Sequence, residues 1–85
     1  MEVFKKTAPV VQILGVDSLP EPFEDTSAAG VKYTGWAPLG VAEGEAGWRI
    51  VRETTTGGVV KREYPNGSMD FAFAWSDRGS YNYGR

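Results

Sequence analysis

The side chains best suited to chemistry in this 85-residue sequence are carboxylates, because the chain has no histidine and no cysteine. Without these two residue types the common nucleophile–base pairs and the thiolate metal sites are absent. Three carboxylate pairs remain: Glu43 with Glu45, Asp70 with Asp77, and Glu53 with Glu63. A two-carboxylate hydrolase needs such a pair held at a fixed distance in a cleft, and a chain this short offers little room for one. The sequence therefore predicts no catalytic residue, and we expect that the protein is not an enzyme.

Two acidic segments contain residue types found in metal or phosphate sites, but not their spacing. The segments "EPFED" (21–25) and "EGEAG" (43–47) do not place three or more oxygen ligands around a glycine turn, as calcium loops do. The stretch "GVAEGEAG" (40–47) lacks the Gly-Lys-Ser/Thr ending of a phosphate loop, and its two acids would repel phosphate. We expect no metal site and no cofactor.

The charge distribution argues against nucleic acid as a partner. The net charge is -2. Residues 1–30 carry two lysines against five acids, whereas residues 31–85 carry seven basic and six acidic groups. Neither part has the basic stripe that phosphate binding needs. No stretch approaches the ~20 apolar residues of a membrane helix, and the N-terminus does not read as a secretory signal. We expect synthesis in a cytoplasm and no membrane partner.

The chain divides into an N-terminal arm and linker (1–30) and a compact β module (31–85). In the arm, residues 10–16 are rich in β-branched side chains and are predicted to form a strand. The prolines and small residues that follow indicate an extended connection. Leu19 and Phe23 could hold this connection on its own domain or on another protein. The apolar side chains of the arm are predicted to contact a partner: Val11, Ile13, Leu19 and Phe23.

The module alternates short β-rich runs with turn signals. Residues 31–36 are predicted as a strand and 37–47 as a long loop. Gly57-Gly58 separates two β-rich runs, 48–55 and 59–64, and supplies the positive φ of a tight hairpin, across which opposite charges are expected to pair. Asn66-Gly67 marks a second turn. Residues 71–75 are predicted as a strand with Phe71, Phe73 and Trp75 on one face, and Tyr81 and Tyr83 lie on the return strand.

This pattern predicts an all-β fold, a small antiparallel sandwich or barrel of about five to six strands. Four aromatic residues are predicted as core: Trp48, Phe71, Phe73 and Trp75. Three further aromatic residues are predicted to lie at a surface or interface: Trp36, Tyr81 and Tyr83. Arg78 is expected to stack on Trp75 while it pairs with Asp70 or Asp77.

A pattern of aromatic, glycine and arginine positions runs through about fifty residues of the module. It reads Tyr33-Thr-Gly35-Trp-Ala37, then Ala46-Gly-Trp48-Arg-Ile50-Val-Arg52, Tyr64-Pro-Asn66-Gly67, Phe71-Ala-Phe-Ala-Trp75-Ser-Asp-Arg78 and Tyr81. In this spacing, residues 33–83 resemble a group of small proteins and domains of tailed bacteriophages and prophages. Trp36 stands where that pattern usually has a smaller or polar residue, which suggests a particular interface.

The resemblance implies a structural part of a virion. We therefore expect an accessory or decoration subunit, or an adaptor, that docks on neighbouring capsid, tail or fibre subunits and on copies of itself. An alternative is a carbohydrate-binding module on the particle surface that uses Trp36, Tyr81 and Tyr83 to bind a surface glycan. A third hypothesis is a small host-directed or regulatory binding protein outside the virion.

Overall fold

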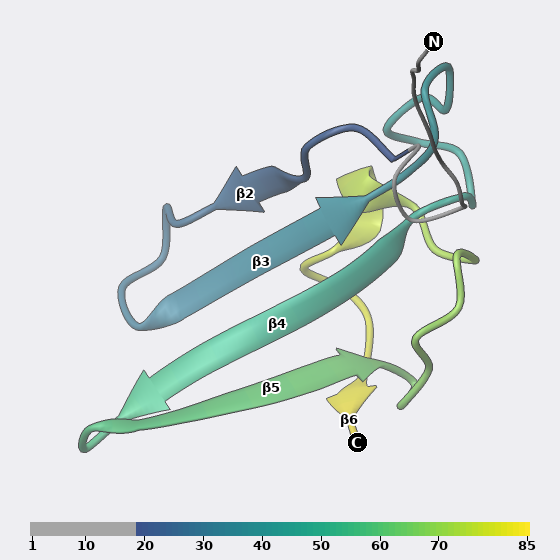
Figure 1. Cartoon of the computed structure of the whole chain (residues 1–85). Coiled ribbons are helices and arrows are strands. Elements are labelled where there is room, and N and C mark those ends of the chain that lie inside the picture. The colour runs from purple at the N-terminus through teal and green to yellow at the C-terminus, as the bar shows by residue number, and fades with distance from the viewer. Residues whose placement is uncertain (1–18) are drawn as a thin grey trace, which may run out of the picture.

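Residues 19–85, which the computed structural model describes, form one five-stranded antiparallel sheet (Figure 1). The strands are β2 (Phe23–Asp25), β3 (Val31–Trp36), β4 (Arg49–Thr56), β5 (Val59–Pro65) and β6 (Tyr83–Gly84). Each strand pairs with its neighbour in sequence, so the sheet is a meander. The predicted all-β fold with about five strands is confirmed. The strand predicted over residues 10–16 and the contact residues Val11 and Ile13 lie outside the described residues.

The turns use the residues that the sequence indicates. Gly57 and Gly58 have φ of 57° and 80°, and Thr56 pairs directly with Val59 across them. Positive φ at both central positions matches the right-handed twist of the two strands. Asn66 and Gly67 also have positive φ (53° and 70°) in the turn after β5. The loop over 37–47 is confirmed as irregular.

The sheet has two faces, and strand alternation assigns residues to them as the sequence predicts. We call the covered side the inner face; Tyr33, Gly35, Ile50 and Trp48 lie on it. The core consists of Ala37, Trp48, Ile50 and Trp75, with Tyr33, Val41, Phe73, Tyr81 and Tyr83 packed around it. The side chains of Lys32, Thr34, Trp36, Arg49, Val51 and Glu53 line the opposite side, the outer face.

The second layer of the fold is an irregular segment over 70–82 rather than a further pair of strands. The strand predicted over 71–75 is wrong: only Phe73 bridges to Trp48, through hydrogen bonds of 2.8 and 3.1 Å, and Trp75–Asp77 form a 3₁₀ helix, η2. Phe71, predicted as core, is 42% exposed. Ala74 and Trp75, which are consecutive in the sequence, are both buried. The segment crosses the inner face of the sheet, so period-two alternation does not apply to it.

Trp75 is the centre of this packing. A methyl group on Gly35 would lie only 2.5 Å from Cε3 of Trp75 and 3.1 Å from Cε3 of Trp48, so the two indoles lie against the β3 backbone. Arg78 stacks over the Trp75 ring with its guanidinium carbon 4.5 Å from the ring centroid. This confirms the predicted stacking on Trp75. The predicted pairing with Asp70 or Asp77 is wrong, because the carboxylate partner is Asp25, at 3.0 Å. We call the Arg78–Trp75 stack with its Asp25 ion pair the clasp.

Strand β2 connects the clasp to the edge of the sheet. Asp25 is its last residue and pairs with Tyr33 of β3. Phe23, at the other end, packs its ring 5.0 Å from Trp48 and 6.0 Å from Trp75. The boundary predicted at residue 30 therefore falls inside the β2–β3 hairpin.

Strand β6 curls the sheet back toward its own inner face. It pairs with the end of β5 through Tyr64 and Pro65, and in Figure 1 it crosses the line of the other strands. The ring of Tyr83 consequently lies 5.8 Å from Tyr33 on β3, with the Arg52 guanidinium 4.6 Å from its centroid. The Tyr83 hydroxyl donates to the Arg78 carbonyl at 2.6 Å.

We expect Gly35→Ala to destabilise the fold, because its Cβ would push the Trp75 indole off the strand. The expected loss is about 1–3 kcal/mol of unfolding free energy, measured by urea denaturation. Gly79→Ala is the matched control, since a Cβ there meets open space, and it should change stability by less than about 0.5 kcal/mol. Equal effects of the two substitutions would contradict the packing role of Gly35.

The clasp also predicts a pH dependence. Hydrogen bonds from Ser27, and then the Arg78 guanidinium, lower the pKa of Asp25 from 3.8 to about 2. A carboxyl with a lowered folded pKa stabilises the fold above its ordinary pKa, and this contribution is lost as the pH falls toward the folded value. Between pH 3.8 and about 2, the stability of Asp25→Asn should therefore fall less steeply than that of the wild type. Asp70→Asn, at an exposed position, should follow the wild-type curve.

Candidate docking surface

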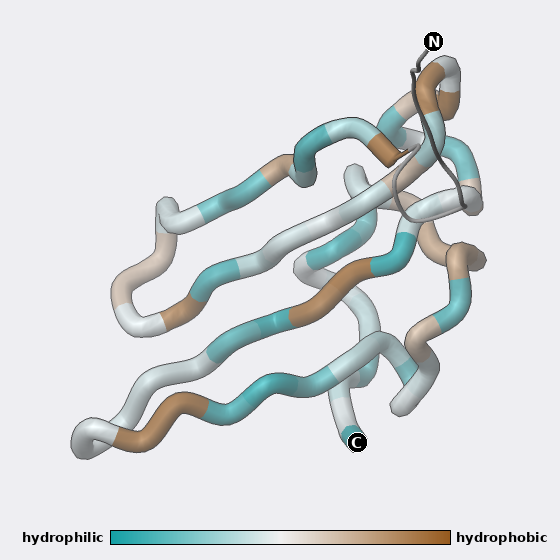
Figure 2. Tube along the Cα trace, in the orientation of Figure 1, coloured by the Kyte–Doolittle hydropathy of each residue, from teal (hydrophilic) through white to brown (hydrophobic). Residues whose placement is uncertain are grey.

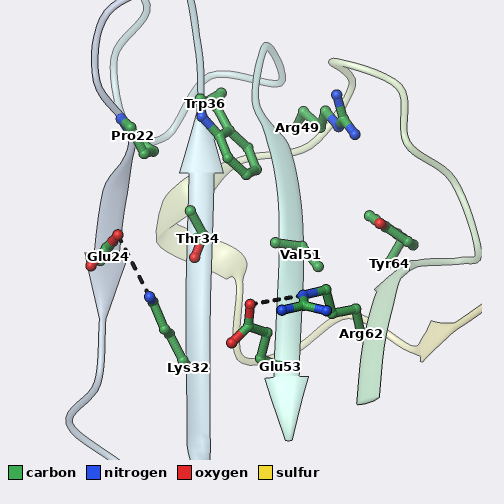
Figure 3. A pocket seen from close by; sticks show the side chains of 10 residues that line it. All are labelled: Pro22, Glu24, Lys32, Thr34, Trp36, Arg49, Val51, Glu53, Arg62 and Tyr64. Carbon is green, nitrogen blue, oxygen red and sulfur yellow. Dashed lines mark hydrogen bonds and ion pairs between the residues drawn. The ribbon is translucent and has the colours of Figure 1, made fainter. Parts of the chain in front are cut away.

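A shallow groove of about 290 Å³ runs across the outer face of the sheet (Figure 3). Figure 1 views the sheet from this side, with the covering segment behind β3 and β4. Ten side chains from four strands and the approach to β2 line the groove: Pro22, Glu24, Lys32, Thr34, Trp36, Arg49, Val51, Glu53, Arg62 and Tyr64. We call this feature the outer groove.

Strand register arranges these side chains in rows. Trp36 lies opposite Arg49 at one end of the groove. Glu24, Thr34 and Val51 form the middle row. At the other end Lys32 lies opposite Glu53, which in turn lies opposite Arg62. Directly opposed side chains on one face are close enough to interact, so the three strand pairings β2–β3, β3–β4 and β4–β5 bring these rows together.

The floor of the groove is dry although this is the open face of the sheet. Thr34 and Val51 are each only 6% exposed. Neighbouring side chains such as Trp36 and Tyr64 form the walls around them, as Figure 3 shows. A floor of two small buried side chains between aromatic walls, with a few polar groups, is typical of surfaces that bind a ligand or a partner side chain.

The charges of the groove do not balance. Lys32 pairs with Glu24 at 3.6 Å, and Arg62 pairs with Glu53 at 3.0 Å. Arg49 is the fifth charged residue, and no carboxylate among residues 19–85 pairs with it. Its guanidinium carbon lies 5.6 Å from the Trp36 ring centroid, and its buried Nε has no hydrogen-bond acceptor in that range. The groove thus carries one surplus positive charge.

Arg52, on the inner face, shows the contrast. Its guanidinium donates to Glu63 at 2.8 Å and stacks on Tyr83. The hydrogen bond from Arg52 lowers the pKa of Glu63, and burial raises the pKa of Tyr83 well above its ordinary value. The Nε of Arg52, like that of Arg49, has no hydrogen-bond acceptor within the described chain. The two arginines differ in that Arg52 pairs with a carboxylate of the fold, whereas Arg49 pairs with none among residues 19–85.

The structure does not bring the predicted contact residues together. Trp36 lies in the outer groove. Tyr81 and Tyr83 pack with the core on the inner side, where the Tyr81 ring lies 5.2 Å from Phe73 and its hydroxyl accepts from the Ala74 N–H at 2.8 Å. Phe23 packs on the buried indoles, and Leu19, half-buried, precedes β2. Trp36 and the two tyrosines cannot form a single platform.

Sequence reasoning missed the remaining walls and floor of the groove, above all Arg49, Thr34 and Tyr64. The signal was present in the alternation, which places Thr34 and Trp36 on one face and Arg49 and Val51 on one face. To place all four on one face, one must know that Trp36 pairs with Arg49 and Thr34 with Val51. This register cannot be inferred from the sequence, because a long loop separates the two strands.

The described residues hold no cluster of three or more carboxylate, histidine or cysteine side chains that suits a metal ion. Within residues 19–85 there is also no helix long and apolar enough to cross a membrane. Comparison of the chain with protein-family models, curated proteins and solved structures found no match.

We expect Trp36 to be dispensable for folding, since its ring lies on the outer face and is not part of the core. Trp36→Ala should reduce the unfolding free energy by no more than about 1 kcal/mol, whereas Trp75→Ala in the core should cost about 3–5 kcal/mol. Urea denaturation followed by far-UV circular dichroism measures both. Comparable losses would show that Trp36 is structural.

Proposed function

We propose that this chain is a structural protein of a tailed-bacteriophage virion, an accessory or decoration subunit or an adaptor. It binds neighbouring capsid, tail or fibre subunits through the outer groove. The observation that carries the docking role is the groove itself: Trp36, Arg49 and Tyr64 around a dry floor on an open sheet face. That the chain belongs to a virion is inferred from the resemblance of residues 33–83 to virion-associated phage proteins.

The composition of the groove suits protein docking. Tryptophan, tyrosine and arginine are the residues that most often dominate interface energies, particularly in a pocket from which water is excluded. The ion pairs Lys32–Glu24 and Arg62–Glu53 stand at the polar end of the groove, and exposed pairs of this kind contribute little energy but help to orient a partner. All these groups stand on strands, so the surface is preorganised.

A docking partner would place an apolar side chain over Val51 and a carboxylate near Arg49. Burial of the apolar group supplies affinity, and the carboxylate accepts from a guanidinium that lacks a partner within the described chain. The N-terminal arm is proposed as a second contact, laid over a neighbour or added to it as a strand. Because β2 belongs to the sheet, a test of the arm should delete only residues 1–18.

The first prediction from this proposal concerns the particle. Mass spectrometry of purified virions from the phage or prophage that encodes the chain should detect it in a fixed ratio to the capsid or tail proteins. Arg49→Ala and Trp36→Ala should lower its occupancy by at least about tenfold, because each removes a groove contact. Lys61→Ala, at an exposed position outside the groove, is the control. Absence of the chain from intact particles would refute a virion role.

A glycan-binding module is the second candidate, and one observation favours it. The outer groove combines the Trp36 ring with hydroxyl and charged groups in a volume near the lower limit for small-ligand pockets. Tyr81 and Tyr83, on the inner side, do not contribute, so Tyr64 takes their place. A glycan titration should then quench tryptophan fluorescence in the wild type and not in Trp36→Ala. A screen without binders would leave the docking role as the better explanation.

A further inference from the structure

Leu39 is the most exposed large apolar residue of the described chain, at 84%. It lies at the tip of the β3–β4 loop, where Figure 2 shows apolar residues at the end of the molecule that β3 points toward. Single exposed leucines are common on protein surfaces. The way in which this one is held distinguishes it.

The loop holds Leu39 rigidly. The Val41 N–H donates to the Pro38 carbonyl at 3.3 Å, and Gly40 has φ of 92°, so Pro38 to Val41 form a turn with Leu39 at its second position. Ala37 on one side is buried, and Val41 on the other packs against the core. Farther along, the Ala42 carbonyl accepts from Nε1 of Trp48 at 3.0 Å. The backbone on both sides of Leu39 is thus anchored to the core, so the loop is ordered before binding.

The charge of the loop complements that of the outer groove. Glu43 and Glu45 follow Leu39 and are both exposed. The Glu45 carboxylate accepts from the Ala42 N–H at 2.6 Å, whereas no ion pair involves either residue within 19–85. The loop is therefore negative, and the groove is positive at Arg49. Glu43 lies beside η2, where its carbonyl accepts from the Ser76 N–H at 2.9 Å and the residue lines a second hollow with Trp75 and Arg78. Its exposed side chain forms no ion pair within 19–85.

We propose that the occupant of the outer groove is the β3–β4 loop of a second copy of this chain. Leu39 of one copy lies over Val51 beside Trp36 of the other, and Glu43 pairs with Arg49. The loop begins directly after Trp36, at one end of the groove. A two-fold axis between two copies lets each fill the groove of the other. This inference rests on the proposed function in that it names a partner for the same docking surface.

The test is the oligomeric state of the full chain, measured by sedimentation velocity from about 1 µM to about 1 mM. A loop seated in a groove is a small interface, so we expect a monomer–dimer equilibrium with a dissociation constant on the order of micromolar. Leu39→Asp should weaken dimerisation by at least about tenfold. Because Leu39 is exposed, this substitution should leave the fold intact, and circular dichroism serves to check this. Val59→Asp, at a residue 60% exposed on the hairpin, should dimerise like the wild type.

A charge exchange tests the pairing itself. Arg49→Glu should weaken the dimer, and the double variant Arg49→Glu with Glu43→Arg should restore it. Because the chain has no cysteine, cross-linking adds a direct measurement. A mixture of Leu39→Cys and Glu24→Cys chains should form a disulfide-linked heterodimer in higher yield than a mixture of Val59→Cys and Glu24→Cys chains.

Several outcomes would overturn this inference: a monomer at all concentrations, equal dimerisation of Leu39→Asp and the wild type, or no rescue by the charge exchange. A monomer in solution that is nevertheless found in virions through Trp36 and Arg49 would place another subunit in the groove, and the proposed function would stand. A dimer with the predicted variant effects but absent from virions would uphold the self-docking surface and refute the virion role.

Discussion

The contact between the Trp75 indole and the backbone of Gly35 is the constraint on which the rest of the structure depends. No other residue type at position 35 leaves room for two indoles against the strand. With Trp75 seated there, η2 has to turn the chain, and Arg78 stacks on the ring and reaches Asp25 at the edge of the sheet. One interaction thereby connects the C-terminal segment, strand β3 and the edge strand β2. Strand β2 has only three residues, so its pairing with β3 alone adds little stability. In a domain of this size, a few large aromatic side chains supply much of the apolar burial.

The arginines show how the two faces of one sheet serve different purposes. Arg52 and Arg78 are both stacked on aromatic rings and paired with carboxylates on the covered side. Arg49 is stacked on Trp36 but has no carboxylate partner among residues 19–85. A planar guanidinium beside an indole can donate hydrogen bonds to a carboxylate from outside the fold. The stability of the domain and its capacity to dock therefore rest on different residues, and this separation allows each to be tested without the other.

Docking is the role that we propose from these features. The outer groove is a preorganised surface on strands, with a buried floor, aromatic walls and a surplus cation. A loop with a fixed apolar tip and two carboxylates lies at the same end of β3. In the proposed dimer the same chain carries both the groove and the loop that fills it, so that one two-fold contact buries both. The proposed virion role rests on the resemblance of residues 33–83 to phage proteins.

The sequence by itself determined the class of fold, the hairpin at Gly57-Gly58, the faces of the strands over 31–36 and 48–64, and the stacking of Arg78 on Trp75. These follow from local rules, because side-chain alternation and turn chemistry act over a few residues. Only the tertiary structure decided the fate of Phe71, the pairing of Arg78 with Asp25 fifty-three residues away, and the convergence of Trp36, Arg49 and Tyr64 in one groove. Alternation fails for 71–75 because that segment covers a sheet instead of extending it. The groove depends on strand register across an eleven-residue irregular loop. A tight turn fixes the register of a hairpin, but a loop of this length does not, so the pairing of β3 with β4 followed only from the tertiary structure.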